Sequence, residues 1–138
     1  MAIQAGIAAE RNYTVIYEVT AAALGEDDGA EGVVLPAVWS TPDMIARMEM
    51  VCAGLVGSHL EPTQMTVGSR NEVTHLAPTP VGAQVRVHAE LIEVDGRKLT
   101  FEVTAFDEQE KVGEGIHIRY IVDIAKFEMR LQQKLPLA

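Results

Sequence analysis

Cysteine and basic residues are scarce in this chain of 138 residues. Its one cysteine, Cys52, cannot form an intrachain disulfide, so we expect a reducing, cytoplasmic environment. The 11 Lys and Arg residues are outnumbered by 20 Asp and Glu residues, and the net charge is −9. Such a chain is a poor nucleic-acid binder, because phosphate binding needs a concentrated basic face.

Long hydrophobic runs are missing too. The longest uncharged apolar run, Met50 to Gly57, is much shorter than the roughly 20 residues that cross a bilayer. The N-terminus, MAIQAGIAAERN, lacks the basic region and the long apolar core of a signal peptide. There is no phosphate loop, dinucleotide fingerprint, GxSxG elbow or zinc motif. We therefore expect one domain over residues 1–138, with no membrane partner and no metal site.

The strongest secondary-structure signal is a helix that starts at STPDMIARME. Ser40 or Thr41 is a good N-cap, Pro42 suits the first turn, and Gly57 is a plausible end. Apolar side chains recur at helical spacing and predict one buried stripe. The stripe consists of Met44, Met48, Val51, Cys52 and Leu55.

The rest of the chain favours strands. Apolar and polar residues alternate through much of the second half, and Asp95-Gly96 is a hairpin signal. Strands are expected at residues 12–20, 65–76, 85–91, 99–105 and 112–124, a lid or entry segment at 33–39, and a short helix at 125–135. One buried helix against a curled antiparallel sheet makes the fold class α+β.

Glu49 stands beside the apolar stripe of the predicted helix. It is the only charged residue from Met48 to Gly57, and glutamate is rarely buried unless it is paired. Periodicity alone favours a side chain that reaches solvent at the edge of the stripe. The alternative is a partly buried carboxylate that acts as a base or a nucleophile.

Three further residues have both a structural and a chemical interpretation. Thr41 is best explained as a helix cap, although its hydroxyl could face a pocket. His75, at the end of a predicted strand, could be a general base or an oxyanion donor, but a lone histidine is more often satisfied by a backbone carbonyl. Gly68 marks either a bulge or a close backbone approach by a ligand, and a simple twist is the structural alternative. Cys52 on the apolar stripe is read as an inert buried thiol.

The order of elements resembles the hotdog fold, and four motifs resemble its fluoroacetyl-CoA thioesterase branch. These motifs are STPDMIARME, TVGSRNEVTH, APTPVG and VGEGIHIRY. The spacings fit as well, with eight residues from Thr41 to Glu49 and twenty-six from Glu49 to His75. The resemblance covers about Val33 to Lys134.

This resemblance implies an acyl-CoA thioesterase for small or short acyl groups, with Thr41, Glu49 and His75 as the catalytic set. It implies that Glu49 attacks the thioester or activates a water, His75 assists the departing thiolate, and Thr41 orients Glu49 and the acyl group. It also implies substrate contacts from Gly68 and Arg119, a homodimer with sites near the subunit interface, and no cofactor beyond the coenzyme A of the substrate.

Two positions depart from the family pattern. Leu35 stands where the fluoroacetyl-specific enzyme has an aromatic gate residue, so the acyl pocket is expected to differ in size or gating. The segment Gly115 to Arg119 lacks the Thr and Glu that usually flank its histidine. The alternative function is a non-catalytic acyl-CoA or small-ligand binding protein on the same fold. A hydratase is a weaker third hypothesis, because the Asp/His context of such enzymes is not evident.

Overall fold

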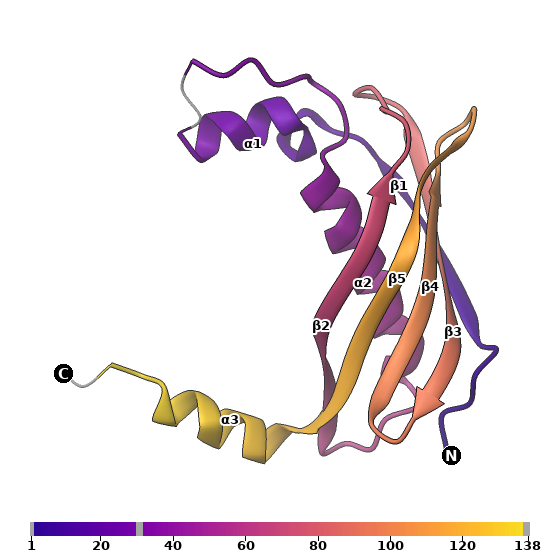
Figure 1. The fold of residues 1–138 in the computed structure, drawn as a ribbon, viewed down its shortest axis with the longest axis vertical. Helices are drawn as coiled ribbons and strands as arrows, with labels where there is room; N and C mark the ends of the chain where they lie inside the picture. The colour runs from indigo at the N-terminus through magenta and orange to yellow at the C-terminus, as the bar shows by residue number, and fades with distance from the viewer. Residues whose placement is uncertain (1, 30–31, 137–138) are drawn as a thin grey trace.

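A long helix lies against an antiparallel sheet in a computed structural model that describes residues 2–29 and 32–136 (Figure 1). The strands are β1 (Ala8–Thr14), β2 (Gln64–His75), β3 (Gln84–Asp95), β4 (Lys98–Phe106) and β5 (Lys111–Asp123). The helices are η1 (Tyr17–Val19, 3₁₀), α1 (Ala21–Asp27), α2 (Thr41–Gly57) and α3 (Ile124–Gln133). The sheet order is β1-β3-β4-β5-β2. The predicted α+β class is confirmed, whereas the single-domain boundary of 1–138 stays a prediction.

The long helix and the strands of the second half lie close to their predicted positions. α2 begins after Ser40, whose side-chain oxygen accepts a hydrogen bond from the Asp43 backbone N–H, and it ends at Gly57. The predicted turn at Asp95-Gly96 joins β3 to β4, and Gly96 has a φ of +59°, which glycine adopts readily. Because Ser40 is the cap, the capping interpretation of Thr41 is wrong.

The N-terminal strand was predicted in the wrong place. β1 covers Ala8–Thr14 rather than 12–20, because its partner β3 begins at Gln84, opposite Thr14. Beyond that point the chain turns through η1, and the Thr20 hydroxyl accepts a hydrogen bond from the Ala23 backbone N–H. Thr20 thereby caps α1, whose alanine-rich start has high helix propensity.

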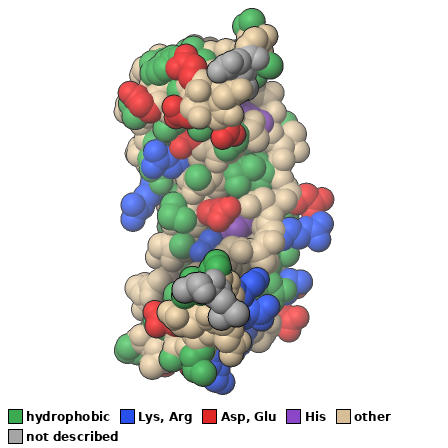
Figure 2. Space-filling model, turned by 90° about the vertical axis from the view of Figure 1, so that its left-hand side faces the viewer, with side chains coloured by type: hydrophobic (Ala, Val, Ile, Leu, Met, Phe, Trp, Pro, Cys, Tyr) green, Lys and Arg blue, Asp and Glu red, His purple; other side chains and the backbone are tan. Residues whose placement is uncertain are grey.

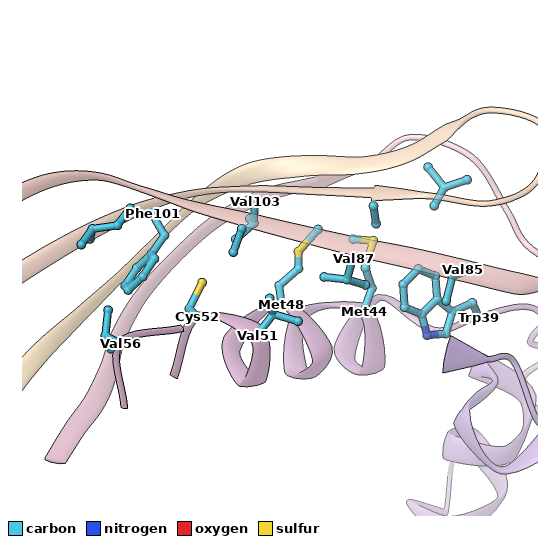
Figure 3. Packing of buried hydrophobic residues seen from close by; sticks show 14 of the residues in the cluster. Trp39, Met44, Met48, Val51, Cys52, Val56, Val85, Val87, Phe101 and Val103 are labelled. Carbon is cyan, nitrogen blue, oxygen red and sulfur yellow. The ribbon is translucent and has the colours of Figure 1, made fainter. Parts of the chain in front are cut away.

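The core lies between α2 and the inner faces of β3 and β4. Figure 3 shows Met44, Met48 and Cys52 of α2 facing Val87, Val103 and Phe101 of the sheet, and all six are fully buried. The alternation predicted for β3 and β4 is therefore confirmed. Burial raises the pKa of the Cys52 thiol to about 12, so this thiol is neutral at physiological pH and contributes only packing.

The two short helices project from one side of the molecule. Figure 1 shows α1 and α3 on the same side, near opposite ends of the long axis, and β2 is the edge strand nearest to that side. α3, Ile124–Gln133, lies close to the helix predicted at 125–135, and its Leu131 and Met129 side chains are exposed. Among the described residues, no helix is both long and apolar enough to cross a bilayer.

We expect Gly115→Ala to destabilise the protein, because β2 and β5 approach each other too closely for a side chain. A Cβ atom at Gly115 would lie 2.6 Å from the Cα of Val73, which is backbone and cannot rotate away. Overpacking of this kind costs about 1–3 kcal/mol or more. Urea unfolding measures the loss. Gly57→Ala is the control: a Cβ there would meet nothing within 4 Å, and an equal loss in both variants would contradict the close approach.

Candidate active site

Thr41 and His75 form a pair at the start of α2. Because Ser40 serves as the cap, the Thr41 hydroxyl is available, and its Oγ1 lies 2.8 Å from Nδ1 of His75 at the end of β2. The indole of Trp39 packs edge-on against the imidazole, with ring centroids 6.2 Å apart. All three residues line a pocket of about 350 Å³, together with residues of the 36–38 and 76–78 segments.

Among residues 2–29 and 32–136, no backbone carbonyl accepts a hydrogen bond from His75, which contradicts the interpretation of His75 as a histidine satisfied by the backbone. In the described part of the chain, its Nε2 is the one buried side-chain nitrogen or oxygen atom that has no hydrogen-bond partner. Burial lowers the pKa of His75 from its ordinary value of 6.5. The imidazole is therefore neutral at pH 7, and Nε2 either accepts or donates a proton according to which tautomer Thr41 selects.

The buried histidines make the stability of the protein depend on pH. Burial also lowers the pKa of His117, so both histidines bind a proton more readily in the unfolded chain. We therefore expect the free energy of unfolding to fall as the pH drops below about 6.5, since protons then favour the unfolded state. Urea unfolding at about pH 7.5 and about pH 5.5 measures the difference. His75→Gln should make this loss of stability at low pH smaller. If the variant loses as much stability as wild type, His75 does not contribute.

Periodicity alone favoured a Glu49 side chain that extends into solvent, and the structure contradicts this. Its side chain is 30% exposed, and its carboxylate is turned towards the sheet. Oε2 accepts a hydrogen bond of 3.0 Å from Nδ2 of Asn71, and Oε1 lies 3.7 Å from Nη1 of Arg119. The carboxylate is thus partly buried and paired, and its action as a base or a nucleophile stays a prediction.

Arg119 is an interior residue. Its side chain is 7% exposed. Its Nε and Nη2 donate hydrogen bonds to the Thr66 hydroxyl and the Thr66 carbonyl at 2.9 and 3.1 Å. Its Nη1 donates to Nε2 of His117 at 3.1 Å, so Nδ1 of His117 carries the proton that goes to the Arg70 carbonyl. The guanidinium is therefore held in place, with one edge towards Glu49.

A β-bulge brings these groups to one face. Side chains along a strand alternate between faces, so residues 68 and 71 would normally point in opposite directions. The register of β2 against β5 shifts between Gly68 and Arg70, so that Gly68 pairs with Arg119 and Asn71 pairs with His117. Directly opposed residues share a face, and Gly68, Asn71 and His75 consequently all face α2. The structure therefore favours the bulge interpretation of Gly68 over the twist.

Gly68 also leaves room for the carboxylate. A Cβ atom at this position would lie 2.9 Å from Oε1 of Glu49 and 3.2 Å from Nη1 of Arg119. A larger residue would push the two charged groups apart. The structure thus gives Gly68 a direct part in placing Glu49, and the predicted contacts of Gly68 and Arg119 with substrate stay predictions.

Leu35 lies in the expected lid segment, where Val33 to Ala37 have no regular secondary structure. At its C-terminal end the segment is tied to the rest of the fold, because the backbone N–H of Trp39 donates a hydrogen bond to the Thr79 carbonyl. Leu35 lines a pocket of about 470 Å³ between this segment and α1. The neighbouring Pro36 lines the pocket of Thr41 and His75. Leu35 therefore lies next to that pocket but lines a different one.

The three predicted catalytic residues form two groups along α2. Thr41 and His75 are in contact, while Glu49 lies eight residues further along the helix. A rise of about 1.5 Å per residue puts its Cα about 12 Å away along the axis. On the face that lies on the left in Figure 1, Figure 2 shows a histidine beside acidic and basic side chains near the middle, and another histidine apart from it nearer the top. Within one chain, Glu49 and His75 are too far apart to contact each other.

Sequence reasoning missed three residues of this region. Asn71 contacts Glu49, Trp39 packs on His75, and His117 bonds to Arg119. A weak signal existed for Asn71, since asparagine is uncommon inside strands. Trp39 is the only tryptophan and directly precedes the helix cap. For His117 the alternation with Ile116 and Ile118 gives no sign of burial, yet the histidine is fully buried.

Comparisons with known proteins agree on one family. The model of the fluoroacetyl-CoA-specific thioesterase family matches residues 18–125. A fluoroacetyl-CoA thioesterase from Streptantibioticus cattleyicolor is 39% identical over 101 residues, which make up 73% of each chain. A solved structure of the fluoroacetyl-CoA thioesterase FlK superposes with a TM-score of 0.89 at 33% identity, covering 99% of this chain and 100% of the other.

More distant structures agree on the fold. A thioesterase superfamily member from Thermus thermophilus gives a TM-score of 0.84 at 28% identity and covers 96% of this chain and 93% of its own. A hot-dog-like protein from Thermanaerovibrio acidaminovorans gives 0.82 at 20% identity, covering 97% and 94%. The predicted hotdog fold is thereby confirmed, as is the resemblance to the fluoroacetyl-CoA thioesterase branch.

Proposed function

The chain belongs to the fluoroacetyl-CoA-specific thioesterase family, and from that premise we propose that it is a thioester hydrolase acting on a small or short-chain acyl-CoA. The observation that carries the proposal is the Thr41–His75 hydrogen bond beside an open pocket, with Glu49 presented from the same helix. These are the positions of the catalytic set implied by the resemblance. Binding alone would not require a carboxylate held at that point of the helix.

The chemistry follows from the groups present. Glu49 either takes a proton from the attacking water or attacks the thioester carbonyl carbon itself, and both routes need a fixed, ionised carboxylate. The carbon–sulfur bond then breaks and the electron pair leaves on sulfur. In the second route water afterwards hydrolyses the anhydride between Glu49 and the acyl group, which releases the acid and restores the carboxylate. His75, which is neutral and oriented by Thr41, assists proton transfer to the departing thiolate. A thiolate is a good leaving group, so we propose no cofactor beyond the coenzyme A of the substrate.

We propose that the working site is shared between two subunits of a homodimer. Within one chain, Glu49 lies about two helical turns from Thr41 and from the His75 side chain that contacts it. A second copy of the chain could instead bring its Glu49 to this Thr41 and His75. β2 supports this arrangement because it is an edge strand whose residues 68–72 are exposed, and exposed edges are ready to pair with another strand. The side of the molecule near β2 also carries α1 and α3 (Figure 1).

The acyl group is proposed to be small, in line with the fluoroacetyl-CoA-specific thioesterase family to which the chain belongs. Leu35 replaces the aromatic gate, so we do not restrict the substrate to fluoroacetyl-CoA. A variant of FlK has been solved in complex with acetyl-CoA, with a TM-score of 0.88 and 32% identity over 97% of this chain and all of the other. We also propose a cytoplasmic location, on the basis of the lone cysteine.

Free-thiol release from a panel of acyl-CoAs, from acetyl and fluoroacetyl to medium chains, tests the proposal. We expect turnover confined to the short members of the panel. An absence of turnover across the whole panel, with acyl-CoA still raising the melting temperature, would support the alternative, a non-catalytic acyl-CoA binding protein.

A further inference from the structure

We propose that Asn71 is a positioning residue for thioester hydrolysis, which fixes the Glu49 carboxylate from the face of β2 that is turned towards α2. The inference rests on the proposed function, because it concerns the geometry of the group that acts on the thioester. Asn71 belongs to none of the residues that the resemblance singled out.

The contacts of Glu49 show how much depends on Asn71. Across residues 2–29 and 32–136, the bond from Nδ2 of Asn71 to Oε2 is the one hydrogen bond that the carboxylate accepts, at 3.0 Å. Arg119 lies 3.7 Å from Oε1, which is beyond hydrogen-bond distance. Arg119 therefore supplies charge, whereas Asn71 sets the rotation of the carboxylate plane.

The two groups hold opposite oxygens of one carboxylate. Arg119 is itself buried and held by hydrogen bonds that Thr66 and His117 accept from it. With Oε1 next to this fixed cation and Oε2 bonded to Asn71, the carboxylate has one preferred orientation. Catalysis gains from such fixation, because a displacement of about 1 Å at a reacting group can lower the rate about 100-fold.

An amide suits this position better than a charged group. Asn71 is neutral, so it fixes the carboxylate without adding a second charge beside Arg119. Its side chain has two N–H donors and one carbonyl oxygen, and only one N–H is used by Glu49. The remaining groups are available to a water or to the thioester. The bulge at Gly68 is what turns Asn71 towards α2, opposite His117.

The experiment compares Asn71→Leu and Asn71→Asp with wild type in thiol-release kinetics. Asn71→Leu removes the hydrogen bond, and we expect kcat to fall about 10- to 100-fold with KM changed by less than about threefold. Asn71→Asp keeps the shape but puts a second carboxylate beside Glu49. Like charges at that distance disfavour double ionisation, so the acid limb of the kcat profile should move to higher pH.

The groups around Glu49 make this shift interpretable. Arg119 and His117 face it from β5, Cys52 adjoins it on α2 as a neutral thiol, and Asn71 faces it from β2. The matched control is Glu114→Gln on β5, which is not an edge strand; its carboxylate is exposed and pairs with Lys111. This control should keep both the rate and the pH profile of wild type.

A second readout does not depend on turnover. NMR titration of the Glu49 side-chain carboxyl, assigned with Glu49→Gln, should show a higher midpoint in Asn71→Asp than in wild type. Wild-type kinetics in Asn71→Leu together with an unmoved midpoint in Asn71→Asp would overturn the inference. If wild type hydrolyses no acyl-CoA, the proposed function fails, and the NMR midpoint alone then decides whether Asn71 contacts Glu49.

Discussion

Replacing Glu49 by Gln should lower the rate of acyl-CoA hydrolysis by about 10²–10⁴-fold, the range that a general base contributes. Glutamine has nearly the same shape, and its side-chain oxygen can still face Arg119. It cannot take a proton from water or attack a carbonyl carbon, however. The effect should therefore appear in kcat, with the substrate still bound. Free-thiol release under saturating acyl-CoA measures it.

Glutamine is a better replacement than alanine for this purpose. Arg119 is buried, and Glu49 is its one acidic neighbour within 4.0 Å among the described residues. Both replacements remove the counter-charge of Arg119, but glutamine keeps an oxygen and the side-chain volume beside the buried guanidinium, whereas alanine removes these too and is the more destabilising change. Melting temperature separates the two effects. Glu10→Gln is the control, because Glu10 also pairs with an arginine, Arg86, but on an exposed surface. A Glu49→Gln protein as active as this control would exclude Glu49 from the reaction.

The fold could be predicted where burial and periodicity coincide. Val85, Val87, Ala89 and Leu91 are all fully buried on one face of β3, as their alternation indicated. The N-terminal strand was misplaced because β-branched residues describe only a local preference. The length of β1 is set by its partner β3, which is more than sixty residues away in the chain, and a local pattern contains no information on that partner.

The site was harder to predict than the fold, for a related reason. Glu49 lies at the edge of the apolar stripe, where a helical wheel cannot distinguish a solvated side chain from one that is paired across to the sheet. The pairing depends on the bulge after Gly68, which changes the face of every later residue of β2. Asn71 and His75 point to α2 only because of that one extra residue. The resemblance to the family named His75 and Glu49, but it gave no reason for Asn71.

The same geometry predicts that two inactive variants should restore activity to each other. Thr41 and His75 are in contact, and Glu49 is about two turns away on the same helix. If a site joins Glu49 of one subunit to Thr41 and His75 of the other, a mixed dimer of Glu49→Gln and His75→Ala subunits has one site with both lesions and one with none. Each variant alone has a lesion in every site.

Co-expression of Glu49→Gln and His75→Ala should therefore recover about a quarter of wild-type activity, since half of randomly assembled twofold dimers are mixed and each of these has one intact site of two. The matched control is co-expression of Thr41→Ala with His75→Ala. Those two residues belong to the same half of a site, so every site in every dimer keeps a lesion. Recovery in the first mixture but not in the second would demonstrate a shared site. Equal inactivity in both would mean that each subunit completes its own site, and the substrate would then have to span the distance from His75 to Glu49.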